Sequence, residues 1–556
     1  MKKLVLPVLL ALTAAAGFAP AALAQTCTST PASAIVTVPA STITTNTTWT
    51  NDKIYVLDGF VYVDNGATLT IQPGTIIKGN LATKGSLIIR RGAKIDARGT
   101  AAQPIVFTSN QPAGQRAAGD WGGLIICGAA PQNLAGDPTI EGGVVANFGG
   151  NNPADNSGFL QYVRIEFPGV AFLPNNEING LTLGAVGSGT TIDHVQVSYS
   201  GDDSFEWFGG TVNAKYLIAF RGTDDDFDTD NGYSGKVQFG VSLRDPAVAD
   251  FASGGASNGF ESDNDVNSST ATPQTSAVFS NMSVFVPSGT LATPYANAMH
   301  IRRNSSISIF NSVFAGHPWG LLLDGSTTQA NAAAGTLALQ NNVLAGFATN
   351  RKARVNSGAT YNAKQFLGAT NDTTLSVAGL LLGANNFSMA WNTNFQPQAG
   401  SPLASGAAFT NAKFSGDTFF DRVSFRGAFA PAGATGTGTA NWATGWTNFD
   451  PQNSCYSAPG AVLSAKDEVP QLNRLGVYPN PTAGAATLAF ELLRPAAVTV
   501  RVLDVTGRTV AVLTQGQRLS TGQQELALPS TLKNGLYTAQ VQTEESSQAV
   551  RFVVSK

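Results

Sequence analysis

The segment Asp203-Ser-Phe-Glu-Trp-Phe-Gly-Gly210 recurs as Asp225-Asp-Phe-Asp-Thr-Asp-Asn-Gly232, 22 residues further on (203 to 225). A third pair of a phenylalanine and an acid follows at Phe260-Glu261. Repeats near this length indicate stacked supersecondary units that cannot bury their apolar faces alone. We interpret these units as successive coils of a parallel β-helix.

Similar repeats begin much earlier in the chain. Gly66-Ala-Thr-Leu-Thr-Ile-Gln-Pro-Gly74 and Gly85-Ser-Leu-Ile-Ile-Arg-Arg-Gly92 each combine a short strand with a glycine turn. Downstream, Asn281, Asn311 and Asn341 recur every 30 residues (281 to 311 to 341). Stacked asparagines form a favourable ladder because each amide can donate to the next, so we expect a ladder here. An asparagine turn in an ordinary β-sandwich is the alternative.

The composition favours strands and turns over helices. Only 12% of the 556 residues are charged, about half the roughly 25% that is typical of globular proteins, and glycine is abundant, with 59 residues. The net charge of −3 provides no basic surface for nucleic acid, so we expect no nucleic-acid partner.

Residues 1–24 have the features of a signal peptide. Lys2 and Lys3 precede the apolar stretch 4–18, and Ala22-Leu-Ala24 is a small-residue cleavage site. The apolar stretch is too short for a membrane anchor, and no other run approaches the roughly 20 apolar residues that a spanning helix needs. We therefore expect an exported protein without a transmembrane segment.

The exported chain has three cysteines. Cys127 lies in an apolar strand, so we expect a buried thiol there. Cys27 and Cys455 bracket the central region, and we hypothesise that they form a disulfide.

The composition of the chain changes after residue 456. Residues 25–456 carry the coil repeats and their caps, and residues 457–473 have the composition of a linker. Residues 474–556 contain roughly seven short strands joined by turns, in the size class of an immunoglobulin-like module. The predicted fold class is therefore all-β: a right-handed parallel β-helix followed by a small immunoglobulin-like β-sandwich.

The last part of the chain resembles a known export module. Val477-Tyr-Pro-Asn-Pro-Thr482, Val502-Leu-Asp-Val-Thr-Gly-Arg508 and Gly535-Leu-Tyr537 look like the C-terminal sorting domain of type IX secretion substrates in Bacteroidetes. This resemblance implies that the type IX machinery is a partner and that the protein is secreted or held on the outer-membrane surface. The central region resembles secreted parallel β-helix proteins, including surface adhesins and polysaccharide lyases, in its fold pattern.

Acidic residues gather on one predicted face of the coils. If the phenylalanines of the repeated pairs point into the coil, strand alternation points Glu206, Asp228 and Glu261 outward, in one column. So many neighbouring carboxylates require a counter-charge or full hydration. The candidate metal ligands are Glu206, Asp224, Asp226, Asp228, Asp230, Glu261 and Asp263.

Three interpretations of these acids stay open. They are solvated turn residues, or they bind Ca²⁺, a cation that takes 6–8 oxygen ligands, or two of them hydrolyse a glycosidic bond. A lyase would combine Ca²⁺ with a basic residue that removes a proton. The candidates for that base are Arg221, Arg244, Arg302 and Arg303.

A long, rigid coil face suits extended polymers. We therefore expect adhesion or carbohydrate binding, with an extracellular polysaccharide as the candidate partner. Trp121, Trp207 and Trp319 are candidate sugar-stacking residues, although aromatic residues in such coils are more often part of the core. The alternative function is a polysaccharide lyase or glycoside hydrolase that uses the acidic face at 202–265.

Overall fold

The structure is a computed structural model. It describes residues 27, 29–173, 176–251, 255–356, 358–383, 385–390, 392–436, 438–460, 472–492, 495–505, 508–543 and 547–556. The predicted signal peptide at 1–24 lies outside these residues, as does most of the predicted linker. Within the described part of the chain, every helix is too short or too polar to cross a membrane.

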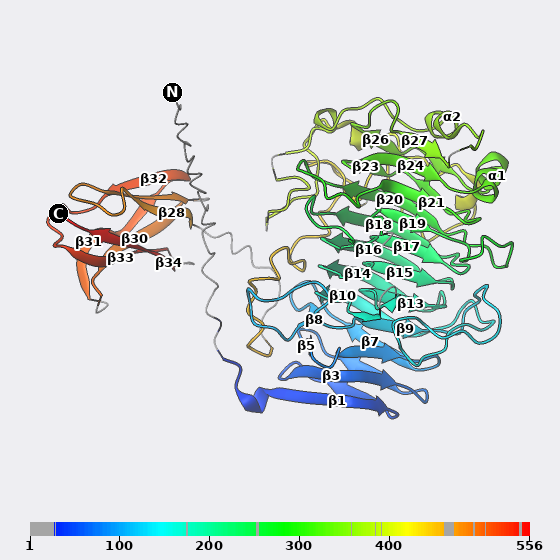
Figure 1. The fold of residues 1–556 in the computed structure, drawn as a ribbon, viewed down its shortest axis with the longest axis horizontal. Coiled ribbons are helices and arrows are strands. Elements are labelled where there is room, and N and C mark those ends of the chain that lie inside the picture. The colour runs from blue at the N-terminus through cyan, green and yellow to red at the C-terminus, as the bar shows by residue number, and fades with distance from the viewer. Residues whose placement is uncertain are drawn as a thin grey trace, which may run out of the picture.

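Three stacks of parallel strands surround one core, which confirms the predicted β-helix (Figure 1). We call the stack that carries the acids the acidic sheet. Its strands are β6 (Ser86–Ile89), β9 (Leu124–Cys127), β13 (Leu181–Gly184), β15 (Phe205–Phe208), β17 (Phe227–Asp230), β19 (Phe260–Ser262), β21 (Asn297–Ile301), β24 (Trp319–Leu323) and β27 (Ala353–Val355).

The other two stacks are joined by long strands that turn a corner. The second stack includes β5 (Ile76–Gly79), β8 (Ile105–Ser109), β23 (Val313–Ala315) and β26 (Val343–Ala345). The third includes β2 (Thr47–Trp49), β4 (Thr68–Ile71), β7 (Lys94–Arg98), β22 (Ser308–Phe310) and β25 (Leu339–Gln340). The corner-turning strands between them are β10 (Gly158–Glu166), β14 (Thr191–Ser198), β16 (Asn213–Phe220), β18 (Lys236–Leu243) and β20 (Val278–Phe285). Two earlier long strands, β1 (Ile35–Ile43) and β3 (Ile54–Val63), instead turn from the second stack into the acidic sheet, because β3 pairs with both β5 and β6.

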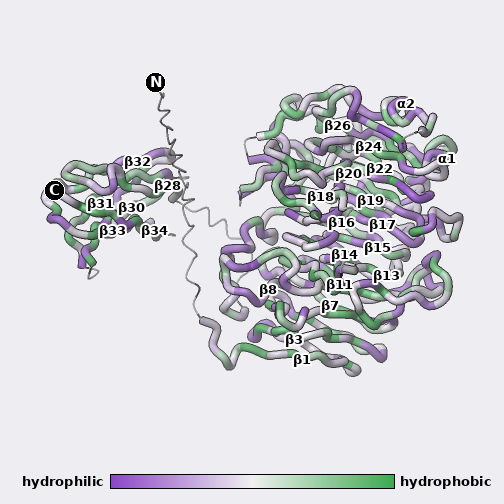
Figure 2. The backbone as a smooth tube through the Cα atoms, in the orientation of Figure 1, coloured by the Kyte–Doolittle hydropathy of each residue, from purple (hydrophilic) through white to green (hydrophobic). Residues whose placement is uncertain are grey.

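Strand alternation explains how each coil packs. Apolar and polar residues are interleaved along the coils (Figure 2). Phe205, Phe227 and Phe260 point into the core and stack on one another, with ring centroids 5.7 and 5.2 Å apart. Each ring buries a large apolar area, so the phenylalanine of the repeat sets the inward face of its strand.

The corners of the long strands form a second column of stacked side chains, in which the residues have positive φ. Tyr162 stacks on His194 at 4.3 Å, and His194 stacks on Tyr216 at 4.4 Å. Asn281, Asn311 and Asn341 adopt the same left-handed conformation in later coils. These corners lie on the outside of the coil, where the chain after β27 covers them. We call the chain between β27 and Cys455 the covering segment.

The prediction that these asparagines hydrogen-bond to one another is wrong. Asn281 donates to the backbone carbonyl of Phe425 at 2.9 Å, and Asn311 accepts from the backbone N–H of Ala408 at 2.9 Å. The recurrence every 30 residues therefore reflects the left-handed corner, which asparagine tolerates well. The side chains anchor the covering segment instead of one another.

The covering segment ends at a disulfide between Cys27 and Cys455, as hypothesised, and Cys127 is a buried free thiol, as predicted. The segment carries little regular structure. The helices in or near this segment are α1 (Ser326–Ala334), α2 (Ala363–Gly368) and the short 3₁₀ turns Ala378–Leu380, Pro402–Ala404 and Ala412–Phe414. A further 3₁₀ turn, Ala32–Ala34, precedes β1. Elsewhere, β11 (Ala171–Leu173) and β12 (Asn176–Glu177) form a small antiparallel hairpin.

The C-terminal module is an antiparallel β-sandwich with its own apolar core, as predicted. One sheet contains β28 (Leu472–Tyr478), β29 (Thr487–Leu492) and β32 (Gly522–Ala527). The other contains β31 (Thr509–Leu519), β30 (Ala496–Leu503), β33 (Gly535–Gln542) and β34 (Ser547–Val554).

Candidate functional site

Glu206, Asp228 and Glu261 lie over one another on consecutive coils of the acidic sheet, as the repeat predicts. Their side chains point away from the core because each follows an inward phenylalanine. We call this row the outward column. From one coil to the next it contains Thr182, Glu206, Asp228, Glu261, His300, Leu322 and Arg354.

A second polar column runs just before these strands, where the repeat places Asp203 and Asp225. The Asp203 side chain accepts the backbone N–H of Asp225 at 2.8 Å, and Asp225 accepts the N–H of Asn258 at 2.5 Å. Asn258 in turn accepts the N–H of Asn297 at 3.0 Å. The sequence prediction missed this ladder, although an aspartate or asparagine two residues before each phenylalanine of the repeat was its signal.

Two groups of three carboxylates have the geometry to hold a metal ion, and both include Asp203. Oxygens of Asp203, Glu206 and Asp228 all lie within 4.8 Å of one another, as do oxygens of Asp202, Asp203 and Asp224. A set made only of carboxylate oxygens suits Ca²⁺ better than a softer metal. The sequence prediction contained Glu206, Asp224 and Asp228 but missed Asp202 and Asp203.

Burial is the main electrostatic feature of this cluster. It raises the pKa of Asp203, Glu206 and Asp228 well above the ordinary carboxyl range. Neighbouring charges raise these pKa values further: Asp228 acts on Asp203, Glu141 on Glu206, and Glu261 on Asp228. A bound cation would remove this penalty by giving the carboxylates a shared counter-charge.

Two polar atoms at the cluster have no hydrogen-bond partner among the described residues. They are the hydroxyl of Thr182, which is 1% exposed, and Oδ1 of Asp228. Thr182 is the neighbour of Glu206 in the outward column. Buried polar atoms without a partner are costly, and oxygen atoms in this state beside the carboxylates are suited to act as ligands of a cation.

At the far side of the cluster, cations of the protein already neutralise the acids. Arg302 pairs with Glu261 and, at 2.8 Å, with Asp263. Arg303 pairs with Asp263 at 2.7 Å. Glu261 and Asp263, both predicted as metal ligands, are therefore bound to guanidinium groups and lie outside the two metal-capable groups.

His300 lies between two carboxylates in the same region. Its Nδ1 is 3.1 Å from Glu261, and its Nε2 is 3.3 Å from Asp324. Burial lowers the pKa of His300, but the two carboxylates outweigh it, and the net shift is upward. Both ring nitrogens therefore have acceptors, which favours the imidazolium form.

Asp230 is a separate, half-buried carboxyl on the acidic sheet. Burial, and then the charge of Asp263, raises its pKa to about 7. It follows Asp228 by two residues and so shares its outward face. It is outside both metal-capable groups among the described residues.

Asp226, one of the candidate metal ligands, does not lie on the outward face with Asp228. Asp226 lies before the first residue of β17, where strand alternation does not apply, and its side chain is fully buried. It pairs with the fully buried Arg244 at 3.1 Å and accepts hydrogen bonds from Ser204, at 3.3 Å, and Ser242. Asp226 and Arg244 are therefore a structural ion pair, and Arg244 is not available as a base.

The remaining candidates from the sequence are mostly structural. Trp121 and Trp207 are fully buried, so neither can stack on a sugar, whereas Trp319 is half-buried. Arg221 lies 3.5 Å from Asp245 and donates to the hydroxyl of Tyr199. Of the three tryptophans, only Trp319 is accessible from outside.

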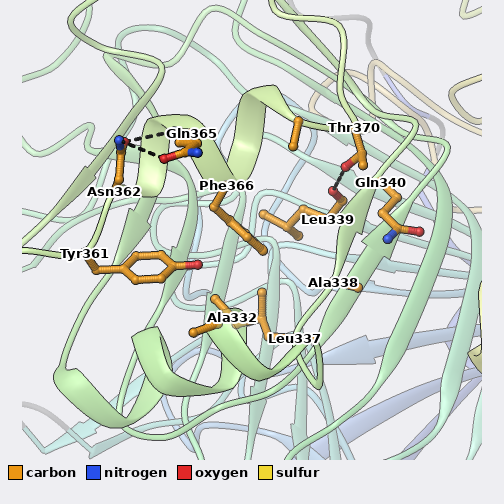
Figure 3. A pocket seen from close by; sticks show the side chains of 13 residues that line it. Ala332, Leu337, Ala338, Leu339, Gln340, Tyr361, Asn362, Gln365, Phe366 and Thr370 are labelled. Carbon is orange, nitrogen blue, oxygen red and sulfur yellow. Dashed lines mark hydrogen bonds between the residues drawn. The ribbon is translucent and has the colours of Figure 1, made fainter.

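A cleft of about 420 Å³ lies elsewhere, between α1 and α2 (Figure 3). Its lining includes the rings of Tyr361 and Phe366 and the amides of Gln340, Asn362 and Gln365, and none of the described residues that line it is charged. Because the acids of the repeat are absent from its wall, this cleft is distinct from the acidic sheet.

Comparison with known families agrees with both parts of the fold. Residues 476–555 match the secretion system C-terminal sorting domain, which implies recognition by the type IX machinery and export to the cell surface or the extracellular space. A search of curated proteins returned no match. Residues 41–394, more than half of the chain, match the pectate-lyase-like β-helix domain, and the chain belongs to that family.

Proposed function

We propose that the acidic sheet binds a divalent cation, calcium by its ligand chemistry, and through it an anionic polysaccharide outside the cell. The observation that carries this proposal is the group formed by Asp203, Glu206 and Asp228, whose oxygens lie within 4.8 Å of one another. Calcium takes carboxylate ligands at flexible geometry and keeps positions for further oxygens.

The surroundings support a ligand that brings its own oxygen atoms. Among the residues that the structure describes, the Thr182 hydroxyl and Asp228 Oδ1 have no hydrogen-bond partner, so both oxygens could contribute to binding such a ligand. The family is named for pectate lyases, whose substrate is an anionic polysaccharide. A uronate carboxylate would complete the coordination of a calcium ion held on the sheet, and the rigid coils would lose little conformational entropy of their own on binding.

Calorimetric titration with calcium tests the cation. We expect saturable binding by the full chain, lost in the D203N/D228N double variant. D52N serves as the control, because Asp52 is exposed and lies far along the chain from the cluster. Equal calcium binding by the wild type and by D203N/D228N would refute the proposed site.

Lyase activity is the second candidate function, favoured by the position of His300. This imidazole lies one coil after Glu261 in the outward column and has a carboxylate at each ring nitrogen. A lyase needs a cation that polarises the substrate carboxylate and a nearby group that moves a proton. Release of unsaturated products from polygalacturonate, lost in H300Q while calcium binding persists, would establish this activity; no product from the wild type would leave binding as the function.

A further inference from the structure

The acidic sheet changes sign along the β-helix. Its acids lie on β15, β17 and β19, whereas the last coils carry Arg351 and Arg354. Arg354 is the last member of the outward column, in register with Leu322. Arg351 lies two residues before Ala353, and Trp319 lies two residues before Leu321, the neighbour of Ala353 on the preceding coil. Arg351 is therefore next to Trp319, and its carbonyl accepts a hydrogen bond from the backbone N–H of Gly320.

Both guanidinium groups pack on one indole ring. The guanidinium carbons of Arg354 and Arg351 lie 4.6 and 5.3 Å from the ring centroid of Trp319. Arg354 is also fixed by a hydrogen bond of 2.9 Å to the side chain of Asn297. Two positive charges therefore lie beside one ring, where each is attracted by the indole and the two repel one another. An anion between them would supply a counter-charge and relieve this repulsion.

No carboxylate within 4.0 Å provides that counter-charge in the described part of the chain. Asp324 is the nearby acid, but it contacts His300 and Asn356. The Nε of Arg354 is buried and has no hydrogen-bond partner there either. Burial, together with the charge of Arg351, lowers the pKa of Arg354 despite the opposing effect of Asp324.

We propose that Arg351 and Arg354, held on Trp319, form an anion site that binds a carboxylate or sulfate group of the same polysaccharide. Guanidinium groups suit these planar or tetrahedral oxyanions because they donate two hydrogen bonds at once. Trp319 is half-buried, so part of its side chain is exposed at this site.

The spacing defines how a polymer would lie. Four coil steps separate Asp228 from Arg354, through Glu261, His300 and Leu322. Strands of neighbouring coils are about 4.8 Å apart, so the two sites are roughly 19 Å apart along the axis. One anionic chain would then bridge the cation at Asp203, Glu206 and Asp228 and the guanidinium pair, running parallel to the axis of the β-helix. This assignment rests on the proposed function.

The test measures binding of the full chain to immobilised polygalacturonate, to a sulfated carrageenan and to a neutral glucan, each over a calcium titration that runs from EDTA to saturation. We expect R351Q/R354Q to weaken binding of at least one anionic polymer about tenfold or more while its calcium midpoint stays that of the wild type. The matched control is K364Q, because Lys364 is an exposed cation on the neighbouring α2. The carboxylated and sulfated polymers distinguish the two kinds of anion.

The outcomes separate the two proposals. Wild-type affinity of R351Q/R354Q for both anionic polymers, or equal losses in K364Q, would overturn the anion site and leave the calcium site standing. Polymer binding that depends on these arginines but not on calcium would keep the anion site and refute the proposed function. Binding of no anionic polymer by the wild type would overturn both. Arg351 is exposed, so R351Q alone provides the measurement if the double variant folds poorly.

Discussion

Glu206 lies directly over Asp228 on the next coil, and oxygens of both are within 4.8 Å of an oxygen of Asp203. Asp203 and Glu206 are each only 7% exposed, so water screens the three carboxylates poorly. Like charges this close in a buried site repel strongly unless a proton or a cation intervenes. Protonation of the cluster, or binding of a cation to it, should therefore change the stability of the β-helix.

Calcium should stabilise the folded chain. A ligand that binds only the folded state adds about 2.7 kcal/mol at 100 times its dissociation constant. We expect the melting temperature to rise with calcium in differential scanning calorimetry and to rise less with magnesium, which demands a smaller octahedral site. D228N should abolish the rise. A rise of the same size in D228N would place the cation elsewhere.

Without a cation, stability should fall as the pH rises. Burial raises the pKa of Asp230 from 3.8 to about 7, and burial with the charge of Asp250 raises that of Asp224 to about 7. Between pH 3.8 and about pH 7, the folded state keeps protons on these carboxyls that the unfolded state has released. The free energy of unfolding is therefore larger at the acidic end of this window and falls as the pH rises. Urea unfolding in EDTA between pH 4 and pH 7.5 checks this, and added calcium should flatten the slope. Stability that increases with pH across the window would contradict the assignment.

The coil repeat and the outward column could be predicted because both follow from local rules. An inward phenylalanine fixes the face of the acid after it, whatever the rest of the coil does. Asp226 was placed wrongly because it lies one residue outside its strand, where that rule ends. The prediction that Asn281 hydrogen-bonds to the next asparagine was wrong. Equal spacing shows which side chains lie over one another, but not whether they bond to one another or to the segment 405–428, more than a hundred residues away in sequence.

Substitution of Asp226 should lower the free energy of unfolding, whereas substitution of Asp228 should not. D226N leaves Arg244 charged and fully buried without its partner, which typically costs about 3–5 kcal/mol. D228N removes one of several repelling acids and should leave stability in EDTA unchanged or higher. Chemical denaturation measures both. Calcium binding should survive in D226N and be lost in D228N, and the reverse pattern would return Asp226 to the metal site.

The cysteines give a direct test of how the chain ends are tied. Cys27 and Cys455 form a disulfide across 428 residues, and Cys127 is buried, with a pKa raised to about 12 by that burial. We expect no alkylation of the native chain, one alkylated thiol after denaturation, and three after reduction, counted by mass spectrometry. The disulfide restricts the unfolded chain, so C27S/C455S should lower the free energy of unfolding by about 2–4 kcal/mol. Three reactive thiols without reductant would exclude the disulfide.

The sorting domain should be dispensable for the β-helix. The apolar core of the C-terminal module consists of residues between Leu475 and Val554, and the main core of the β-helix ends at Leu367, so the two cores share no residue. A chain that ends at Gly460 keeps the disulfide at Cys455 and the whole covering segment. We expect it to keep the calcium-dependent melting transition of the full chain and to lose only the transition of the small sandwich. A lower melting temperature of the β-helix after this truncation would mean that the module stabilises it, and would argue against a domain made only for export.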